Sequence, residues 1–203
     1  MKIIEPSAEL VDEINPDEIL SKLEMCGRVS HKSNPTGRPL HTHGAAAAFV
    51  RKIIKRGHES VLEHVSLTFK IVCDRAIMAE LTRHRLASFT VESTRYVKYD
   101  ELAAINPFPD DIVGESFWLS MMSEAERNYK DLSNSGATPE LARAILPQCT
   151  ATTLYMTANL REWRHVLKLR TDKAAHPQMR FIMNQILAVF KEKLPVIVED
   201  IQS

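Results

Sequence analysis

Residues 65–81 have the sequence VSLTFKIVCDRAIMAEL. Apolar and polar side chains alternate from Val65 through Lys70, which is the pattern of a half-buried β-strand. Asp74 then stands where a helix cap is expected, and the residues from Ala76 to Leu81 have the apolar spacing of a helix. A strand followed directly by a helix predicts a fold of the α/β type.

Further elements extend this pattern in both directions along the chain. Asn15 and Pro16 predict the start of one helix, and Gly57 predicts the end of another. The other predicted elements are strands at 2–5 and 149–156, a loop at 33–39, and helices at 45–54, 112–132, 138–146, 160–170 and 178–200. We therefore expect one α/β (α+β) domain over residues 1–203, with a mainly antiparallel sheet flanked by helices.

The charges of the chain balance, with 26 Lys and Arg residues against 26 Asp and Glu residues. A protein that binds nucleic acid without sequence preference usually carries a basic excess, so we expect no nucleic-acid partner. Any site for an anion must then be a local cluster of basic residues.

No apolar run is long enough to cross a membrane, and the N-terminal residues do not have the pattern of a signal peptide. Cys26, Cys73 and Cys149 are odd in number and lie far apart. This spacing predicts neither a disulfide framework nor a zinc knuckle, and it favours a reducing cytoplasm. Together with the lack of a long apolar run, it leads us to expect a protein without a membrane partner.

Residues 83–96 have the sequence RHRLASFTVESTRY, which contains three arginines. A guanidinium group keeps its proton in proteins and binds phosphate with a planar fork of donors. The stretch therefore indicates a cradle for an anion. The alternative is a solvated basic patch at the end of a helix, where arginine also suits the helix dipole.

The order of residues in this stretch resembles the signature of the flavin-dependent thymidylate synthases. The matching residues are Arg83, His84, Arg85, Ser88, Ser93 and Arg95. The resemblance extends over about residues 55–180 and implies the fold of that family and its homotetramer with sites shared between subunits. It also implies methylation of dUMP to dTMP with FAD as cofactor and with NADPH and 5,10-methylenetetrahydrofolate as co-substrates.

The resemblance assigns roles to individual residues. For dUMP it implies Glu80, Arg83, Ser93, Thr94, Arg95, Arg143 and Arg170. For FAD it implies His58, Ser60, Arg83, His84, Arg85, Asn159, Arg161 and His165. Arg170 is expected to be the catalytic residue, because a guanidinium facing O2 and N3 would stabilise negative charge on the pyrimidine.

Simpler interpretations exist for the same residues. Residues 57–64 are also typical of a helix end with its capping residues, Arg143 of a solvated charge, and residues 159–170 of a basic helix face. His58, Glu63 and His64 do not have the spacing of a helical zinc motif, so no metal is predicted.

Two positions differ from the pattern that many members of the family share. Glu80 stands where many have glutamine, and Val91 stands where the family usually has an amide or an acid. Val91 makes no polar contact, so either Glu92 or Thr90 replaces it, or the pocket is altered.

None of the three cysteines has a neighbour in the sequence that would activate it as a nucleophile. The resemblance implies instead that reduced flavin activates the pyrimidine. Three alternatives stay open: a flavoenzyme for another pyrimidine nucleotide, an inactive member that only binds nucleotide, and a nucleic-acid-binding module. The last would use Arg83, Arg85, Arg161 and Arg164.

Overall fold

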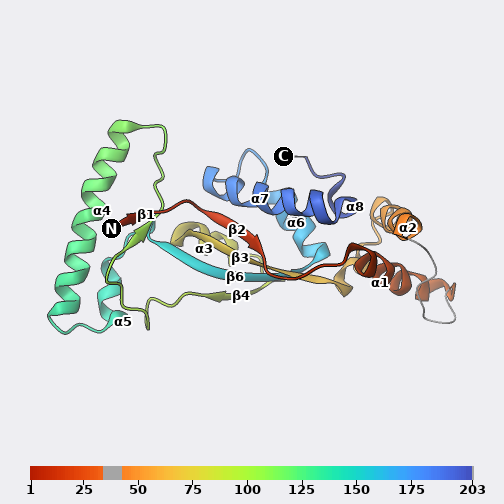
Figure 1. Ribbon diagram of the computed structural model, residues 1–203, viewed down its shortest axis with the longest axis horizontal. Coiled ribbons are helices and arrows are strands. Elements are labelled where there is room, and N and C mark those ends of the chain that lie inside the picture. The colour runs from red at the N-terminus through yellow and green to blue at the C-terminus, as the bar shows by residue number, and fades with distance from the viewer. Residues whose placement is uncertain (34–42, 203) are drawn as a thin grey trace. The chain divides into compact units, whose positions relative to one another are not determined.

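The computed structural model describes residues 1–33 and 43–202 (Figure 1). The chain divides into two compact units. The first unit contains Met1–Ser7, Ile71–His84 and Phe89–Tyr155, and the second contains Ala8–Lys70, Arg85–Ser88 and Met156–Ser203. The single domain over 1–203 stays a prediction, and each unit is described by itself below.

The main sheet has the strand order β2-β3-β6-β4. Its strands are β2 (Ser7–Leu10), β3 (Ser66–Asp74), β6 (Ala151–Asn159) and β4 (Ser88–Val91). In the second unit the Leu160 amide donates to the Val65 carbonyl over 2.9 Å, and in the first unit the Arg75 amide donates to the Thr150 carbonyl over 3.1 Å. The start of β3 thus pairs with the end of β6, and the end of β3 pairs with the start of β6. The antiparallel sheet and the mixed α/β class are therefore confirmed.

The first unit also holds a two-stranded sheet, in which β1 (Lys2–Ile3) pairs in parallel with β5 (Ala103–Ala104). Its helices are α3 (Arg75–Leu81), α4 (Ile112–Asn134), α5 (Pro139–Ala142) and the 3₁₀ helix η3 (Arg143–Ile145). Helix α4 packs against α5 and η3. Leu102, Tyr129 and Ala142 form a buried cluster in this unit, which fixes the start of η3.

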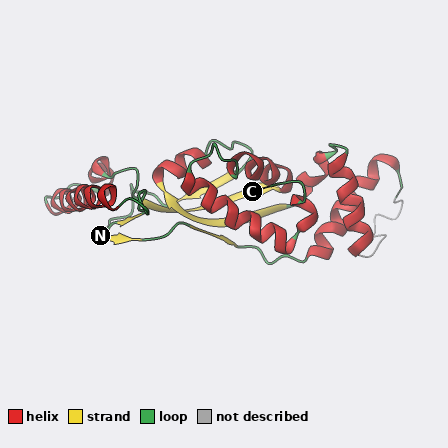
Figure 2. Ribbon diagram, turned by 90° about the horizontal axis from the view of Figure 1, so that it is seen from above, coloured by secondary structure: helices red, strands yellow, loops and turns green. Residues whose placement is uncertain are grey.

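The second unit is mostly helical. Its elements besides the strands are α1 (Pro16–Arg28), η1 (Val29–His31), α2 (His43–Lys55), η2 (Glu59–His64), α6 (Leu160–Arg170), α7 (Pro177–Lys193) and α8 (Pro195–Val198). Helix α6 packs against α7, α8 and η2. Figure 2 shows the helices of the chain in red and its strands in yellow. The ring of Phe69 lies 5.0 Å from that of Trp163 and 6.0 Å from that of Phe190, which joins β3, α6 and α7 in one apolar core.

Local signals in the sequence account for several helix boundaries. Asn15 Oδ1 accepts a hydrogen bond from the Asp17 amide over 3.1 Å, and Asp74 Oδ1 accepts one from the Ile77 amide over 2.7 Å. Gly57 follows α2 with φ +71°, a conformation that glycine adopts without strain. These three predictions are confirmed, because each depends on contacts within one turn.

Other boundaries differ from the prediction. The expected strand at 149–156 begins at Ala151 and runs to Asn159, and the expected helix at 138–146 is α5 followed by η3 without a side-chain cap from Thr138. The long helix expected at 178–200 is confirmed through Lys193, where α7 (Pro177–Lys193) ends; its continuation is wrong, because Pro195 has no N–H for a continuous helix and starts α8 instead. The predicted loop at 33–39 lies, beyond Ser33, outside the described residues.

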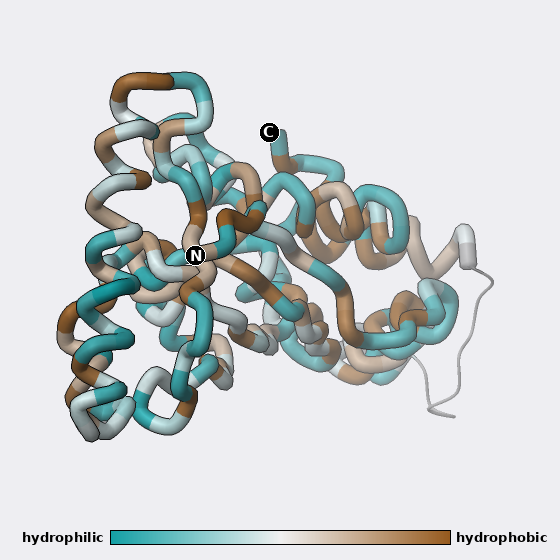
Figure 3. The backbone as a smooth tube through the Cα atoms, turned by 60° about the vertical axis from the view of Figure 1, so that its left-hand side comes forward, coloured by the Kyte–Doolittle hydropathy of each residue, from teal (hydrophilic) through white to brown (hydrophobic). Residues whose placement is uncertain are grey.

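The described helices do not combine the length and the apolar composition needed to cross a membrane. Figure 3 shows hydrophobic and hydrophilic residues alternating along them. Helix α7 buries Met179, Ile182, Met183 and Ile186, whereas Ile112, Val113, Phe117 and Met121 of α4 are exposed.

Candidate functional site

A small polar pocket in the first unit contains two of the predicted nucleotide residues, Thr94 and Arg143. Its volume is about 260 Å³, and it is lined by Arg75, Thr94, Arg143, Ala144, Leu146, Pro147 and Gln148. Arg143 is the first residue of η3, and its Nη1 donates to Thr94 Oγ1 over 3.4 Å. Thr94 is only 4% exposed, so its hydroxyl is held at the wall of the pocket.

Arg75 lines the same pocket and was not predicted as a site residue. It is the first residue of α3, and its backbone amide is fixed by the carbonyls of Gln148 and Thr150 at 2.9 and 3.1 Å. Its Nη1 is buried and has no hydrogen-bond partner within the described part of the chain. A buried guanidinium nitrogen without an acceptor is costly, so this wall of the pocket suits an anion.

Ser93 and Arg95 flank Thr94 in the chain. The Arg95 amide donates to Ser93 Oγ over 3.3 Å, and Arg95 Nη2 lies 3.6 Å from Glu140 Oε1. Both partners of this ion pair are about half exposed. An exposed pair of this kind contributes little, so Arg95 can exchange Glu140 for a ligand at small cost.

Helix α3 carries Glu80, predicted for dUMP, and is followed by Arg83, predicted for dUMP and FAD, and by His84, predicted for FAD. Glu80 is half-buried, Arg83 is exposed just beyond the helix, and His84 is buried. The Arg83 and His84 amides continue the last turn by donating to the carbonyls of Glu80 and Leu81. Arg85, which follows directly in the sequence, belongs to the second unit and is exposed.

Glu92 and Thr90, the two neighbours of Val91, differ in how free their side chains are to contact a ligand. The Tyr99 hydroxyl donates to Glu92 Oε1 over 2.5 Å, and the Glu92 amide donates to the Thr153 carbonyl over 2.9 Å. Burial raises the pKa of Tyr99, and the hydrogen bond to Glu92 raises it further, so the phenol keeps its proton. Glu92 is thus engaged by Tyr99, whereas Thr90 is exposed at the surface of β4.

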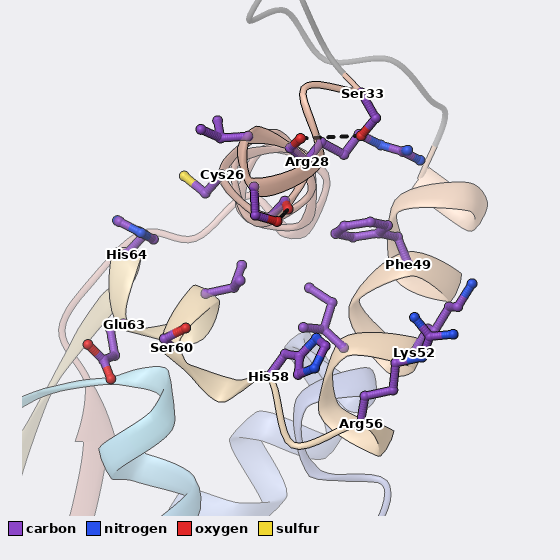
Figure 4. A pocket seen from close by; sticks show the side chains of 15 residues that line it. Cys26, Arg28, Ser33, Phe49, Lys52, Arg56, His58, Ser60, Glu63 and His64 are labelled. Atoms are coloured by element: carbon purple, nitrogen blue, oxygen red, sulfur yellow. Dashed lines mark hydrogen bonds between the residues drawn. The ribbon is translucent and has the colours of Figure 1, made fainter.

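A larger pocket lies within the second unit, with a volume of about 880 Å³ (Figure 4). It is lined by the end of α1, one side of α2, and η2, and it includes the predicted flavin residues His58 and Ser60. Gly57 turns the chain after α2, and the His58 amide donates to the Ile53 carbonyl over 3.0 Å. Figure 4 shows His58 and Ser60 on adjacent parts of the same wall.

Helix α6 places a second set of predicted flavin residues in this unit. Arg161 Nη1 donates to Glu63 Oε1 over 2.6 Å, and Glu63 itself lines the larger pocket. This hydrogen bond raises the pKa of Arg161. Asn159 Oδ1 accepts from the Glu162 amide over 2.9 Å and so caps the helix. His165 is exposed one turn after Arg161.

Arg170 lies in the last turn of α6 and is half-buried. It belongs to the second unit, whereas Arg143 and Thr94 belong to the first. The predicted site residues therefore fall into two sets. One set lies in the first unit, at or near its small pocket, and the other lies in the second unit, at its larger pocket and on α6.

Arg164 has a structural position, contrary to the alternative that assigned it to a nucleic-acid surface. It is 2% exposed, and it donates to Asp200 Oδ1 and Oδ2 over 2.7 and 2.9 Å. It also donates to Glu59 Oε1 over 3.3 Å and to the Ile197 carbonyl. A buried arginine with these partners is not available to bind a phosphate backbone, so this part of the alternative is wrong.

Comparison with known proteins adds a family to this geometry. The model of the family described as "thymidylate synthase complementing protein" matches residues 9–196. The chain is 33% identical to a probable flavin-dependent thymidylate synthase of Mycobacterium phage D29, over 97% of this chain and 91% of the relative. It is 38% identical to a flavin-dependent thymidylate synthase of Pyrococcus furiosus, over 67% of this chain and 59% of that relative.

One solved structure is similar over almost the whole chain. It is the UMP/dUMP methylase PolB from Streptomyces cacaoi bound with 5-Br dUMP, with a TM-score of 0.84 and 25% identity. The similarity covers 98% of this chain and 96% of that chain.

Proposed function

Since the chain belongs to the thymidylate synthase complementing protein family, the flavin-dependent thymidylate synthases, we propose that it methylates dUMP to dTMP. The proposal includes FAD as cofactor, NADPH as reductant and 5,10-methylenetetrahydrofolate as carbon donor. The observation that carries it is the first-unit pocket, where Arg143, Thr94 and Arg75 offer hydrogen-bond donors to one small space.

The phosphate of dUMP is the group that we assign to this pocket. A phosphate oxygen would supply the acceptor that the buried Nη1 of Arg75 lacks among the described residues. Arg143 would add a second charge-assisted donor, and the hydroxyl of Thr94 a neutral one. Ser93 and Arg95 follow in the chain, and Arg95 becomes available when it leaves Glu140.

The cysteines support a route without a cysteine nucleophile. Burial raises the pKa of the Cys73 thiol to about 12, so it stays protonated at neutral pH. The Cys149 thiol is held between Trp118 Nε1 and Met122 Sδ, each at 3.2 Å. Cys26 lines the second-unit pocket, and we expect a Cys26→Ser protein to keep its dTMP formation.

Arg170 is the residue that we propose for charge stabilisation on the pyrimidine. An arginine side chain is a strong, planar hydrogen-bond donor, which suits a ring that becomes negative at O2 and N3. An Arg170→Ala protein that binds FAD and dUMP normally should lose most of its kcat. Full turnover in that protein would contradict the assignment.

The second-unit pocket fits part of a flavin nucleotide, because its lining offers hydroxyl, imidazole and basic groups around about 880 Å³. His58, Ser60 and Arg161, which is held beside Glu63, are the residues that we expect to hold it there. Asn159, His165, Arg83, His84 and Arg85 complete the proposed flavin contacts. When bound, reduced FAD supplies the reducing equivalents of the reaction.

The test is an assay of dTMP formation with dUMP, methylenetetrahydrofolate, NADPH and FAD, with each omitted in turn. We expect product only in the complete mixture and flavin absorbance in the purified protein. Product formation that does not depend on flavin would overturn the proposal, and so would a flavin-loaded protein that binds dUMP but does not methylate it.

UMP should be tested as a second substrate in the same assay. The similar solved structure is described as a UMP/dUMP methylase, and Val91 removes a polar group beside the signature arginines. UMP in place of dUMP would therefore separate a thymidylate synthase from a flavoenzyme for another pyrimidine nucleotide.

We also propose that the enzyme is a cytoplasmic homotetramer with sites shared between subunits. A chain of 203 residues must otherwise enclose a dinucleotide, a nucleotide and a folate alone. Light scattering on the flavin-loaded protein should give four times the chain mass, and an active monomer would contradict this.

A further inference from the structure

The second-unit pocket has a basic side that none of the assigned flavin contacts uses. Lys52 and Arg56 both line the pocket and lie four residues apart near the end of α2, so they share one face of the helix. Figure 4 shows both side chains leaving the same helix, across the pocket from His64. Both side chains are exposed to solvent.

The other cations around this pocket have acidic partners. Arg28 Nη2 lies 2.7 Å from Glu24 Oε1 and its guanidinium stacks 4.8 Å from the centre of the Phe49 ring. Arg161 pairs with Glu63 at 2.6 Å. Arg51, next to Lys52 in the chain, pairs with Glu199 at 2.5 Å.

Lys52 and Arg56 differ from these cations. Within residues 1–33 and 43–202, neither side chain has a hydrogen bond or an ion pair. Two like charges four residues apart destabilise a helix modestly, and no carboxylate compensates them here. A basic pair that borders a large pocket and has no acidic partner suits an anion from outside the chain.

We propose that Lys52 and Arg56 form a subsite for the anionic tail of a reactant that comes to the flavin. This inference rests on the proposed function. The subsite would recognise a group with two or more negative charges that lies far from the ring that reacts with the flavin. The 2′-phosphate of NADPH and the glutamate carboxylates of the folate both have this chemistry.

The two sources are distinguished by ligands that lack the tail. The variant is Lys52→Gln with Arg56→Gln, and the matched control is Lys55→Gln, which removes a charge from the same helix at a position outside the pocket lining. KM is measured for NADPH against NADH, and for methylenetetrahydrofolate against methylenetetrahydropteroate, which lacks the glutamate. FAD affinity is measured in parallel by quenching of flavin fluorescence.

We expect KM to rise about tenfold or more for one tailed reactant, as the loss of charge-assisted hydrogen bonds implies. KM for its tail-less counterpart, kcat and FAD affinity should stay unchanged, and the Lys55→Gln protein should resemble the parent. Unchanged KM values for all four reactants would overturn the subsite. An equal loss of FAD affinity would also overturn it, because the pair would then hold the diphosphate of FAD.

The result is separable from a failure of the proposed function. Titration calorimetry of the flavin-loaded protein with NADP⁺, NAD⁺, methylenetetrahydrofolate and methylenetetrahydropteroate measures the subsite without turnover. A parent protein that forms no dTMP defeats the proposed function, whereas equal affinities of parent and variant for every tailed ligand defeat the subsite alone.

Discussion

Arg164 in the second unit and Arg75 in the first differ in the hydrogen-bond acceptors that surround their guanidinium groups. Arg164 is 2% exposed and has carboxylates of Asp200 and Glu59 and a carbonyl of Ile197 as acceptors. Arg75 borders a pocket and has a buried Nη1 without an acceptor among the described residues. The comparison teaches that the acceptors around a guanidinium, more than its burial, separate a structural arginine from a candidate ligand contact.

The largest effect should come from Arg164→Met, which removes the structural arginine. Two acidic side chains and a buried carbonyl would lose their donor, so we expect unfolding to become easier by about 3 kcal/mol. Urea denaturation at neutral pH measures the loss as a lower midpoint. A midpoint within error of the parent would show that Arg164 and Arg75 do not differ as the comparison states.

Arg75→Gln should have the opposite profile. We expect dUMP affinity to fall about tenfold or more, which corresponds to about 1.5–3 kcal/mol of binding, with little change in stability. Calorimetric titration with dUMP measures the affinity. Arg127→Gln is the control, because Arg127 is an exposed residue of α4 that pairs with Glu124, three residues earlier, at 3.7 Å. A loss of stability with unchanged dUMP affinity would make Arg75 a structural residue too.

Asp200→Asn should have a smaller effect that depends on pH. Hydrogen bonds from Arg164 hold the pKa of Asp200 well below its usual range. A pKa that is lower in the folded state stabilises the protein above the unfolded value of about 3.9, and this contribution is lost as pH falls through the folded value. We expect a loss of about 1 kcal/mol at pH 7, since the carboxylate is half exposed and screened by water.

Urea midpoints of the parent and of the Asp200→Asn protein at pH 7 and below pH 3 provide the measurement. The two proteins should differ at pH 7 and converge in acid. A difference that grows as the pH falls would contradict the sign of this coupling.

Arg161→Gln should have the smallest effect on stability, because its pair with Glu63 is exposed on both sides. Its effect on FAD affinity should be larger, since Arg161 is a proposed flavin contact. Fluorescence quenching and urea denaturation on the same protein separate the two quantities. If the free energy of unfolding falls by more than the free energy of FAD binding, Arg161 is a structural residue like Arg164.

The sequence predicted those features of the fold that depend on near neighbours in the chain. Asn15, Asp74 and Gly57 act through contacts within one turn, and residues 160–170 form a helix with the predicted bounds. The antiparallel sheet and the family were also predicted. Pro195 is a local signal for the break between α7 and α8, although the predicted helix continues through it.

Features that depend on distant residues were not predicted. β2 and β5 are only four and two residues long, and their pairing depends on segments far along the chain. Arg75 directly follows a capping aspartate, and only the approach of residues 147–150 makes it part of a pocket. Lys52 and Arg56 have the composition of an ordinary helix end, and only the three-dimensional structure shows that they lack acidic partners among residues 1–33 and 43–202.

Two strands pass into helices without a single connecting residue. β3 ends at Asp74 where α3 begins at Arg75, and β6 ends at Asn159 where α6 begins at Leu160. One inserted residue at either junction would rotate the following helix by about 100°, because an α-helix has 3.6 residues per turn. An insertion after Asn159 would thus turn Arg161 away from Glu63 and every later side chain with it. Homologues and engineered variants should therefore keep these two junctions at constant length, and tags or loop grafts belong between Pro109 and Asp110, where an exposed loop can lengthen at little cost.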